Sequence, residues 1–315
     1  MDRTYITWRA LARAAGPMYP DQVQQIINII GPTFFVVALG YLFGKMNRAS
    51  VSVLIDVAMF IATPCLVFSS MYSSTIYMSE AMRLWASCLL IMGGTFVIAW
   101  LAFGLTGKRR SGLYLPIVFA NTINIPLPII YLAFGNEGVA KAVLFYIPNG
   151  LLIYSLGIYL ASGQKGLRQG LKAILRTPLI YAAVLGLALN LAGVPLPEVV
   201  LTSVKFMGQA AVPLILLVLG MTIGHIRFKQ VPLTLTAGAI RMGGGFAVGL
   251  LAVWLLGLTG LPRAIVLFEA AMPSAVVVSV LCTKYNNEAE LVASIVLATT
   301  LVSVAVIPAL LYYLT

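Results

Sequence analysis

The stretch Phe119–Phe134, FANTINIPLPIIYLAF, lies inside an apolar run long enough to cross a bilayer, yet it carries two asparagines and two prolines. Proline lacks a backbone N–H donor and clashes with the preceding helical turn, so Pro126 and Pro128 interrupt any continuous helix. Backbone groups freed within hydrocarbon must face protein or a water-filled cavity. The stretch therefore predicts a broken helix with a site at membrane depth.

A second interruption lies in the other half of the chain, where Pro273 stands within the apolar segment FEAAMPSAVVVS at 268–279. Paired interruptions in the two halves of a chain are the best pointer in a sequence to a transporter's binding site. The two stretches are therefore predicted to build one site together.

The composition is that of an integral membrane protein. The 315 residues are 61% hydrophobic and 9% charged, with a mean hydropathy of +1.00, which excludes an ordinary soluble domain. The net charge of +11 comes from short loops between apolar runs, so it indicates topology and not a nucleic-acid partner. The sequence carries no catalytic motif and no cofactor motif, so an enzyme is not expected.

Ten hydrophobic runs follow one another, each long enough to span a membrane with some tilt. They lie near 23–43, 51–71, 84–106, 113–134, 139–162, 174–193, 199–224, 234–258, 262–283 and 289–314.

The basic residues of the loops predict the orientation. Twelve follow the odd-numbered runs and four lie on the opposite side, the N-terminal tail apart. The excess of Lys and Arg marks the cytoplasmic side, which places the odd-numbered loops in the cytoplasm and both termini outside. A bacterial inner (plasma) membrane is the expected location. The twelve are Lys45, Arg48, Lys108, Arg109, Arg110, Lys165, Arg168, Lys172, Arg176, Arg227, Lys229 and Lys284.

Internal symmetry divides the chain into two repeats. Pro32–Gly40 (PTFFVVALG) and Pro178–Gly186 (PLIYAAVLG) share their proline-to-LG spacing. Five helices per half is an odd number, so the second half must insert upside down. The sequence predicts an all-α membrane protein with ten transmembrane helices in a 5+5 inverted repeat. Its parts are an N-terminal tail at 1–20, repeats at 21–162 and 178–315, and a short basic cytoplasmic loop at 163–177.

Ionisable groups within apolar runs are costly, so each is a functional hypothesis. Glu269 stands one helical turn before Pro273 and is predicted to sense Na⁺ or H⁺. Asp56 and Lys205 lie at matching depths in the second and seventh runs and are further candidates for ion coupling. Arg83 and Arg241 lie near the starts of runs and are interpreted as interface anchors.

The predicted binding residues surround the two interruptions. Half-helix ends offer free N–H groups and a positive dipole end, and amides and hydroxyls add neutral hydrogen-bonding groups. This combination suits a small organic anion. The candidates are Asn121, Asn124, Pro126, Asn149, Pro273 and Ser274.

Over residues 23–315 the chain resembles the auxin efflux carrier family of plant carriers and bacterial permeases. The likeness rests on ATPCLVF at 62–68, the asparagine-bearing break at 121–128, VPLILLVLGMTI at 212–223 and EAAMPSAVVVSVLCTKYNNE at 269–288. The resemblance implies broken, crossing helices 4 and 9 and a transport domain that moves like an elevator against a scaffold. It also implies a homodimer through the scaffold helices and carboxylate substrates such as auxin, malate or malonate.

Sodium–bile acid symporters share this architecture, and a glutamate in their ninth helix helps to bind Na⁺. The resemblance therefore implies Na⁺ near Glu269 and a substrate role for Asn121. The leading hypothesis is a secondary active transporter of small organic anions in the lipid bilayer, with no cofactor beyond a coupling ion. A sodium-coupled symporter of bulky amphipathic anions, and a substrate-gated channel or sensor, remain alternatives.

Overall fold

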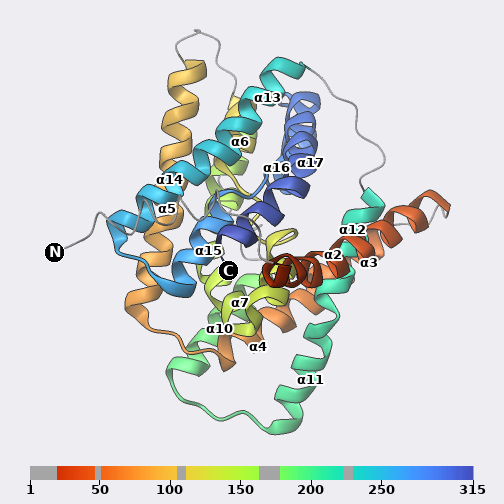
Figure 1. The fold of residues 1–315 in the computed structure, drawn as a ribbon, viewed down its shortest axis with the longest axis vertical. Coiled ribbons are helices and arrows are strands. Elements are labelled where there is room, and N and C mark those ends of the chain that lie inside the picture. The colour runs from red at the N-terminus through yellow and green to blue at the C-terminus, as the bar shows by residue number, and fades with distance from the viewer. Residues whose placement is uncertain (1–19, 47–50, 105–110, 163–177, 223–229, 315) are drawn as a thin grey trace.

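The computed structural model describes residues 20–46, 51–104, 111–162, 178–222 and 230–314, and this part of the chain is helical and contains no strand (Figure 1). An all-helical fold is expected in hydrocarbon, because a helix satisfies its own backbone hydrogen bonds. The first half contains α2 (Pro20–Met46), α3 (Val51–Val57), η1 (Ala58–Ala62), α4 (Thr63–Ser73), α5 (Met78–Phe103), α6 (Ser111–Val118), α7 (Pro126–Leu152), η3 (Ile153–Gly157) and α8 (Ile158–Ala161). The second half contains α10 (Pro178–Leu191), α11 (Glu198–Gln209), α12 (Ala211–Thr222), α13 (Val231–Ala239), η5 (Ile240–Gly244), α14 (Gly245–Leu256), α15 (Gly260–Ala270), α16 (Val276–Lys284) and α17 (Ala289–Leu314).

Six helical segments of the described chain are long and apolar enough to cross a membrane. The predicted runs near 113–134 and 262–283 are each divided, and the apolar helices Gly31–Met46 and Pro178–Leu191 are shorter. The total of ten spans therefore stays a prediction. The six segments are Ser52–Ser73, Met78–Phe103, Pro126–Ala161, Glu198–Met221, Val231–Leu256 and Ala289–Leu314.

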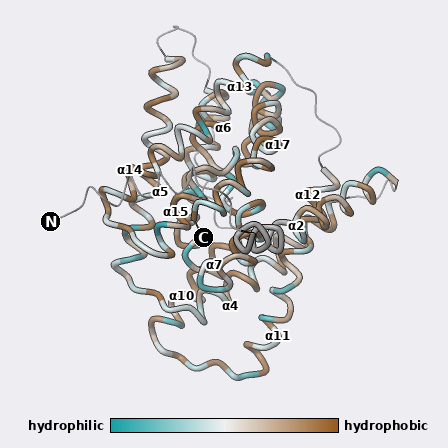
Figure 2. The backbone as a smooth tube through the Cα atoms, viewed as in Figure 1, coloured by the Kyte–Doolittle hydropathy of each residue, from teal (hydrophilic) through white to brown (hydrophobic). Residues whose placement is uncertain are grey.

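Large apolar side chains cover the outer surface as well as the interior. Phe206 is 78% exposed, Trp254 is 75% exposed and Phe35 is 65% exposed. Apolar residues colour most of the helices along their length in Figure 2. An apolar surface of this extent marks contact with lipid and not with water.

The helices form two sets. In the first set α2 packs along α12, and α4 packs on α10 and α11, with α3 and η1 beside them. In the second set α5 lies between α7 and α14, while α17 contacts α13 and α16. This second set includes the upper and left part of the molecule in Figure 1. The two sets meet chiefly where α4, α2 and α12 contact α7 and where α2 contacts α17.

Glycines bring α2 and α12 together in the first set. A Cβ atom at Gly220 would overlap the carbonyl oxygen of Val37, and a Cβ atom at Gly40 would overlap the carbonyl oxygen of Leu217. Small residues allow two helix backbones to approach in a membrane, where van der Waals packing holds them.

Lys141 fixes α7 against the start of α5 in the second set. Its ammonium lies 2.6 Å from Glu80 and 3.6 Å from Glu137, and the Lys141 side chain is 6% exposed. We expect Lys141→Met to lower the free energy of unfolding by about 2 kcal/mol, because Glu80 loses its charged partner. Thermal unfolding of the purified protein in detergent measures this loss.

Glu137→Gln is the matched control, because this side chain is 55% exposed and lies farther from the ammonium. We expect almost no change for this control, as is usual for exposed ion pairs. Equal losses from Lys141→Met and Glu137→Gln would contradict the assignment of the stabilisation to the Glu80 pair.

Candidate functional site

Both predicted interruptions are present. The helix α6 ends at Val118 and α7 begins at Pro126, so residues 119–125 lie outside helices. The helix α15 ends at Ala270 and α16 begins at Val276. Pro126 stands at the first turn of α7, where a missing N–H costs nothing. We call these two non-helical segments, 119–125 and 271–275, the paired breaks.

The paired breaks bind each other through their backbones. The N–H of Asn121 donates to the carbonyl of Pro273 at 2.8 Å, and the N–H of Ala275 donates to the carbonyl of Phe119 at 2.9 Å. Ala120 and Ser274 face each other as an isolated antiparallel bridge. In this reciprocal pair of hydrogen bonds, Phe119 is equivalent to Pro273 and Asn121 is equivalent to Ala275. A local two-fold axis therefore relates the two breaks.

A cavity of about 280 Å³ opens beside the paired breaks. Its wall joins the two helix sets: α3, η1 and α10 contribute from the first set, and the breaks, α7 and η3 contribute from the second. Residues from the breaks and α16 are Ala120, Asn121, Thr122, Ile123, Asn124, Ala275, Val276 and Val277. The others are Ile55, Met59, Phe60, Tyr146, Asn149, Gly150, Ile153, Tyr154, Pro178 and Leu179.

Three asparagines supply the amides of the wall. The Asn121 side chain accepts a hydrogen bond from the N–H of Asn124 at 3.0 Å. Its Nδ2 is buried and has no hydrogen-bond partner within the described chain. Asn149 donates to the carbonyl of Ala120 at 3.2 Å and to the hydroxyl of Thr122 at 2.9 Å. Asn149 therefore holds the first break in shape, whereas the Nδ2 donor of Asn121 is available to a ligand.

Three of the predicted binding residues support the breaks from outside the cavity wall. Ser274 is fully buried, and its hydroxyl donates to the carbonyl of Pro116 at 2.6 Å. Its N–H donates to the hydroxyl of Thr299 at 3.2 Å. Pro273 uses its carbonyl in the pairing, and Pro126 starts α7. These residues position the wall.

The predicted ion-coupling residues are not gathered at one place. Asp56 and Lys205 are exposed, and neither belongs to the cavity wall. Glu269 is fully buried near the end of α15. Neither of its carboxyl oxygens has a hydrogen-bond partner among the described residues. A buried carboxyl group without a partner favours a bound proton or cation over the bare charge.

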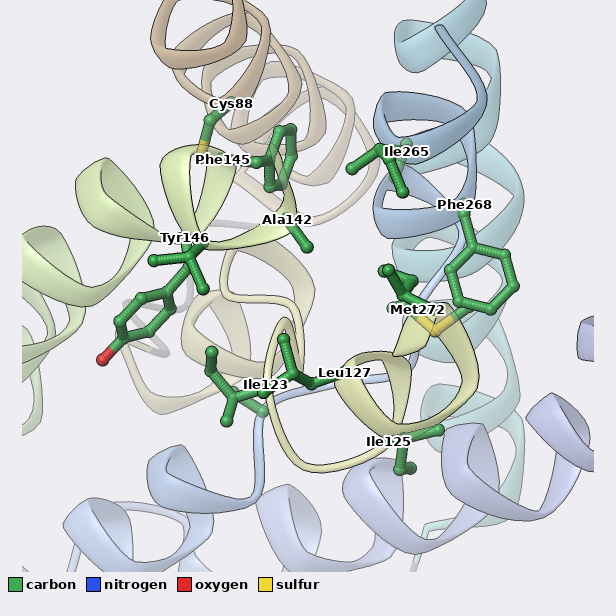
Figure 3. Close-up of a cluster of buried hydrophobic side chains, with 14 of the residues drawn as sticks. Cys88, Ile123, Ile125, Leu127, Ala142, Phe145, Tyr146, Ile265, Phe268 and Met272 are labelled. Atoms are coloured by element: carbon green, nitrogen blue, oxygen red, sulfur yellow. The ribbon is translucent and has the colours of Figure 1, made fainter. Parts of the chain in front are cut away.

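Two tyrosines in the wall were missed by the sequence reasoning. Tyr146 lies one helical turn before Asn149 on α7, and Tyr154 lies in the π-helical turn η3. Figure 3 shows the Tyr146 hydroxyl directed away from Phe145 and Ile265 of the apolar cluster. The spacing of Tyr146 from Asn149 could have revealed the first tyrosine.

The interpretation of Arg241 as an interface anchor is wrong. Its side chain is fully buried, and its guanidinium donates to the carbonyls of Ile117, Val118 and Ala270 at 2.9–3.0 Å. It lies in the π-helical turn η5 between α13 and α14. Arg83, in contrast, is exposed, and its Nε donates to the carbonyl of Ser79 in its own helix at 3.3 Å.

Apolar helices around a polar, paired break define an integral membrane protein of the transporter class. The chain matches the family of membrane transport proteins over residues 25–313. It belongs to this family, which confirms the resemblance to the auxin efflux carriers.

Two similar proteins are uncharacterized transporters of archaea. One, from Methanothermobacter thermautotrophicus, is 29% identical over 87% of this chain and 93% of its own length. The other, from Methanocaldococcus jannaschii, is 27% identical over 92% of this chain and 97% of its own length. The likeness therefore extends over nearly the whole of all three chains.

Proposed function

We propose that the protein is a secondary active transporter of small organic anions that works by elevator-type alternating access. One observation carries this proposal: the cavity at the paired breaks lies between the two helix sets. A substrate held there would move with the second set when it slides against the first. In this proposal the first set is the scaffold, and it also forms the homodimer.

The packing supports a 5+5 inverted repeat with ten crossings. The first helix of the first half, α2, packs on α12 of the second half, and the first helix of the second half, α10, packs on α4 of the first. The reciprocal hydrogen bonds between the breaks likewise join equivalent positions of the two halves. In this arrangement the basic loops face the cytoplasm and both termini lie outside the plasma membrane.

The wall of the cavity favours an anion of small size. Among the described residues, the wall holds no acidic or basic side chain. The positive dipole ends of α7 and α16 and the free Nδ2 of Asn121 would therefore provide the electrostatic attraction. Ile55, Met59 and Phe60 would contact a carbon skeleton. A volume of about 280 Å³ is at the lower limit of the pockets that hold drug-sized ligands, about 300–1,000 Å³.

A thermal-shift screen of the purified protein tests the substrate class. The probes are malonate, malate and indole-3-acetate, each measured with Na⁺ and with K⁺. We expect at least one carboxylate to raise the melting temperature, because a ligand that binds only the folded state stabilises it. The same compound should then show saturable counterflow in proteoliposomes. Single-channel conductance without counterflow would contradict a carrier.

Glu269→Gln tests whether this carboxyl group couples transport to an ion. We expect the variant to bind the carboxylate as the wild type does, while its uptake loses its dependence on pH or on Na⁺. The reason is that an amide keeps the shape of the group but cannot take up a proton or hold a charge. Uptake measured across a pH series, in Na⁺ and in K⁺, shows whether this dependence is lost. Unchanged ion dependence would remove Glu269 from coupling.

A further inference from the structure

Backbone carbonyls at the ends of the two half-helices α6 and α15 converge on the guanidinium of Arg241. Its Nη1 lies 3.0 Å from the carbonyl oxygens of both Ile117 and Val118, at the end of α6. Its Nη2 lies 2.9 Å from the carbonyl oxygen of Ala270, at the end of α15. Carbonyls at a helix C-terminus carry partial negative charge. In many transporters such half-helix carbonyls coordinate Na⁺.

The local backbone is arranged to admit this side chain. Arg241 belongs to the π-helical turn η5, and Gly245 follows it by one turn on α14. A Cβ atom at Gly245 would overlap both the Ala270 carbonyl and the guanidinium. The planar fork of an arginine can bond several carbonyls at once, which the point charge of a lysine does less well.

We propose that Arg241 is a built-in cation of the paired breaks: it occupies the carbonyls that a Na⁺ would bind and holds the ends of α6 and α15 together. Arg241 is absent from the cavity wall, and the first residue that the break after α6 contributes to this wall is Ala120, two residues after Val118. It is therefore a positioning residue that acts on the substrate through the breaks.

The same geometry disfavours the predicted Na⁺ near Glu269. Ala270 follows Glu269 directly, and its carbonyl is already bonded to Arg241. The donor set at this position therefore fits a fixed guanidinium and not a mobile Na⁺. The Glu269 carboxyl oxygens, which have no hydrogen-bond partner among the described residues, are then available to a proton.

The test measures the melting temperature of the purified full chain in NaCl, KCl and choline chloride at equal ionic strength. We expect no Na⁺-specific shift for the wild type. Arg241→Met should melt several degrees lower, and Na⁺ but not K⁺ or choline should restore part of the loss, because the carbonyls are then free. The melting temperature of Arg241→Lys should lie between those of the wild type and Arg241→Met, because lysine keeps the charge but lacks the planar fork of the guanidinium.

Gly245→Ala and Gly243→Ala form a matched pair that leaves Arg241 in place. A Cβ atom at Gly243 meets nothing within 4 Å, so that variant should melt no lower than the wild type. Gly245→Ala should melt lower, because it displaces the guanidinium from Ala270. This pair can be measured in the same three salts even when Arg241→Met does not fold, and partial recovery of Gly245→Ala in Na⁺ alone is then the expected result.

Three results would overturn the proposal: Na⁺-specific stabilisation of the wild type, Arg241→Met at least as stable as Arg241→Lys, or equal melting of the two glycine variants. The measurement requires no transport and no carboxylate. Its failure would therefore leave the proposed function standing.

Discussion

Gly220→Ala is expected to destabilise the protein by about 3 kcal/mol, because the added methyl group overlaps backbone atoms and not a flexible side chain. The Cβ atom would meet the carbonyl of Val37 and lie 2.8 Å from the backbone N of Tyr41. Neither atom can move unless α2 shifts away from α12. Thermal unfolding in detergent measures the loss, and Gly40→Ala on the facing helix should give a similar one.

Gly31→Ala is the control for this variant, because it lies on α2 and a Cβ atom there meets nothing within 4 Å. Alanine has the higher helix propensity, so the control should be neutral or slightly more stable. If Gly220→Ala and Gly31→Ala have the same melting temperature, the close crossing of α2 and α12 does not determine the stability of the first helix set.

Asn121→Asp is expected to weaken the binding of a carboxylate by about 100-fold or more, because a like charge in a desolvated wall costs several kcal/mol. The variant also removes the free Nδ2 donor. The oxygen that accepts from the N–H of Asn124 remains, so the paired breaks should keep their form. Titration of the carboxylate that stabilises the wild type, followed by melting temperature, measures the change.

Asn136→Asp carries the same change of charge outside the cavity wall. Asn136 is exposed on α7, and its Oδ1 accepts from the hydroxyl of Ser70 at 3.4 Å, a role that a carboxylate oxygen also fills. We expect its carboxylate affinity to stay near that of the wild type. A comparable loss in both variants would mean that overall charge, and not Asn121, governs binding.

The position of the first break could be predicted from the sequence because proline and asparagine act locally. Pro126 removes a donor from its own turn, and this effect needs no knowledge of the neighbours. The sequence alone does not show which residues of the two breaks are equivalent. The backbone bonds make Phe119, not Pro126, the equivalent of Pro273. Spacing along a chain does not report which peptide groups meet across a fold.

The directions of Arg241 and Tyr154 could not be predicted from the sequence for a different reason. Arg241 lies near the start of an apolar run, where a long basic side chain ordinarily reaches the membrane surface. Its inward direction depends on the π-helical turn η5 and on the room left by Gly245. Tyr154 likewise faces the cavity from the π-helical turn η3. A π-helical turn changes the direction of the side chains around it, and no simple residue pattern predicts such a turn.

Position along a helix does not show which face Asp56 and Lys205 occupy, because the face depends on the rotation of the helix. Both side chains are exposed, while Ile55, the residue next to Asp56, lines the cavity. One step along a helix turns a side chain by roughly 100°, since a turn holds about 3.6 residues. The face that a charged residue occupies requires the packed structure.

The paired breaks are joined by hydrogen bonds between peptide groups, and peptide groups are the same in every amino acid except proline. Evolution can therefore exchange the cavity-lining side chains at 121 and 275 without breaking the backbone hydrogen bonds between the breaks. Recognition could drift from one cargo to another while the architecture stays constant. Engineers who want a new specificity should vary these side chains and leave the lengths of both breaks untouched.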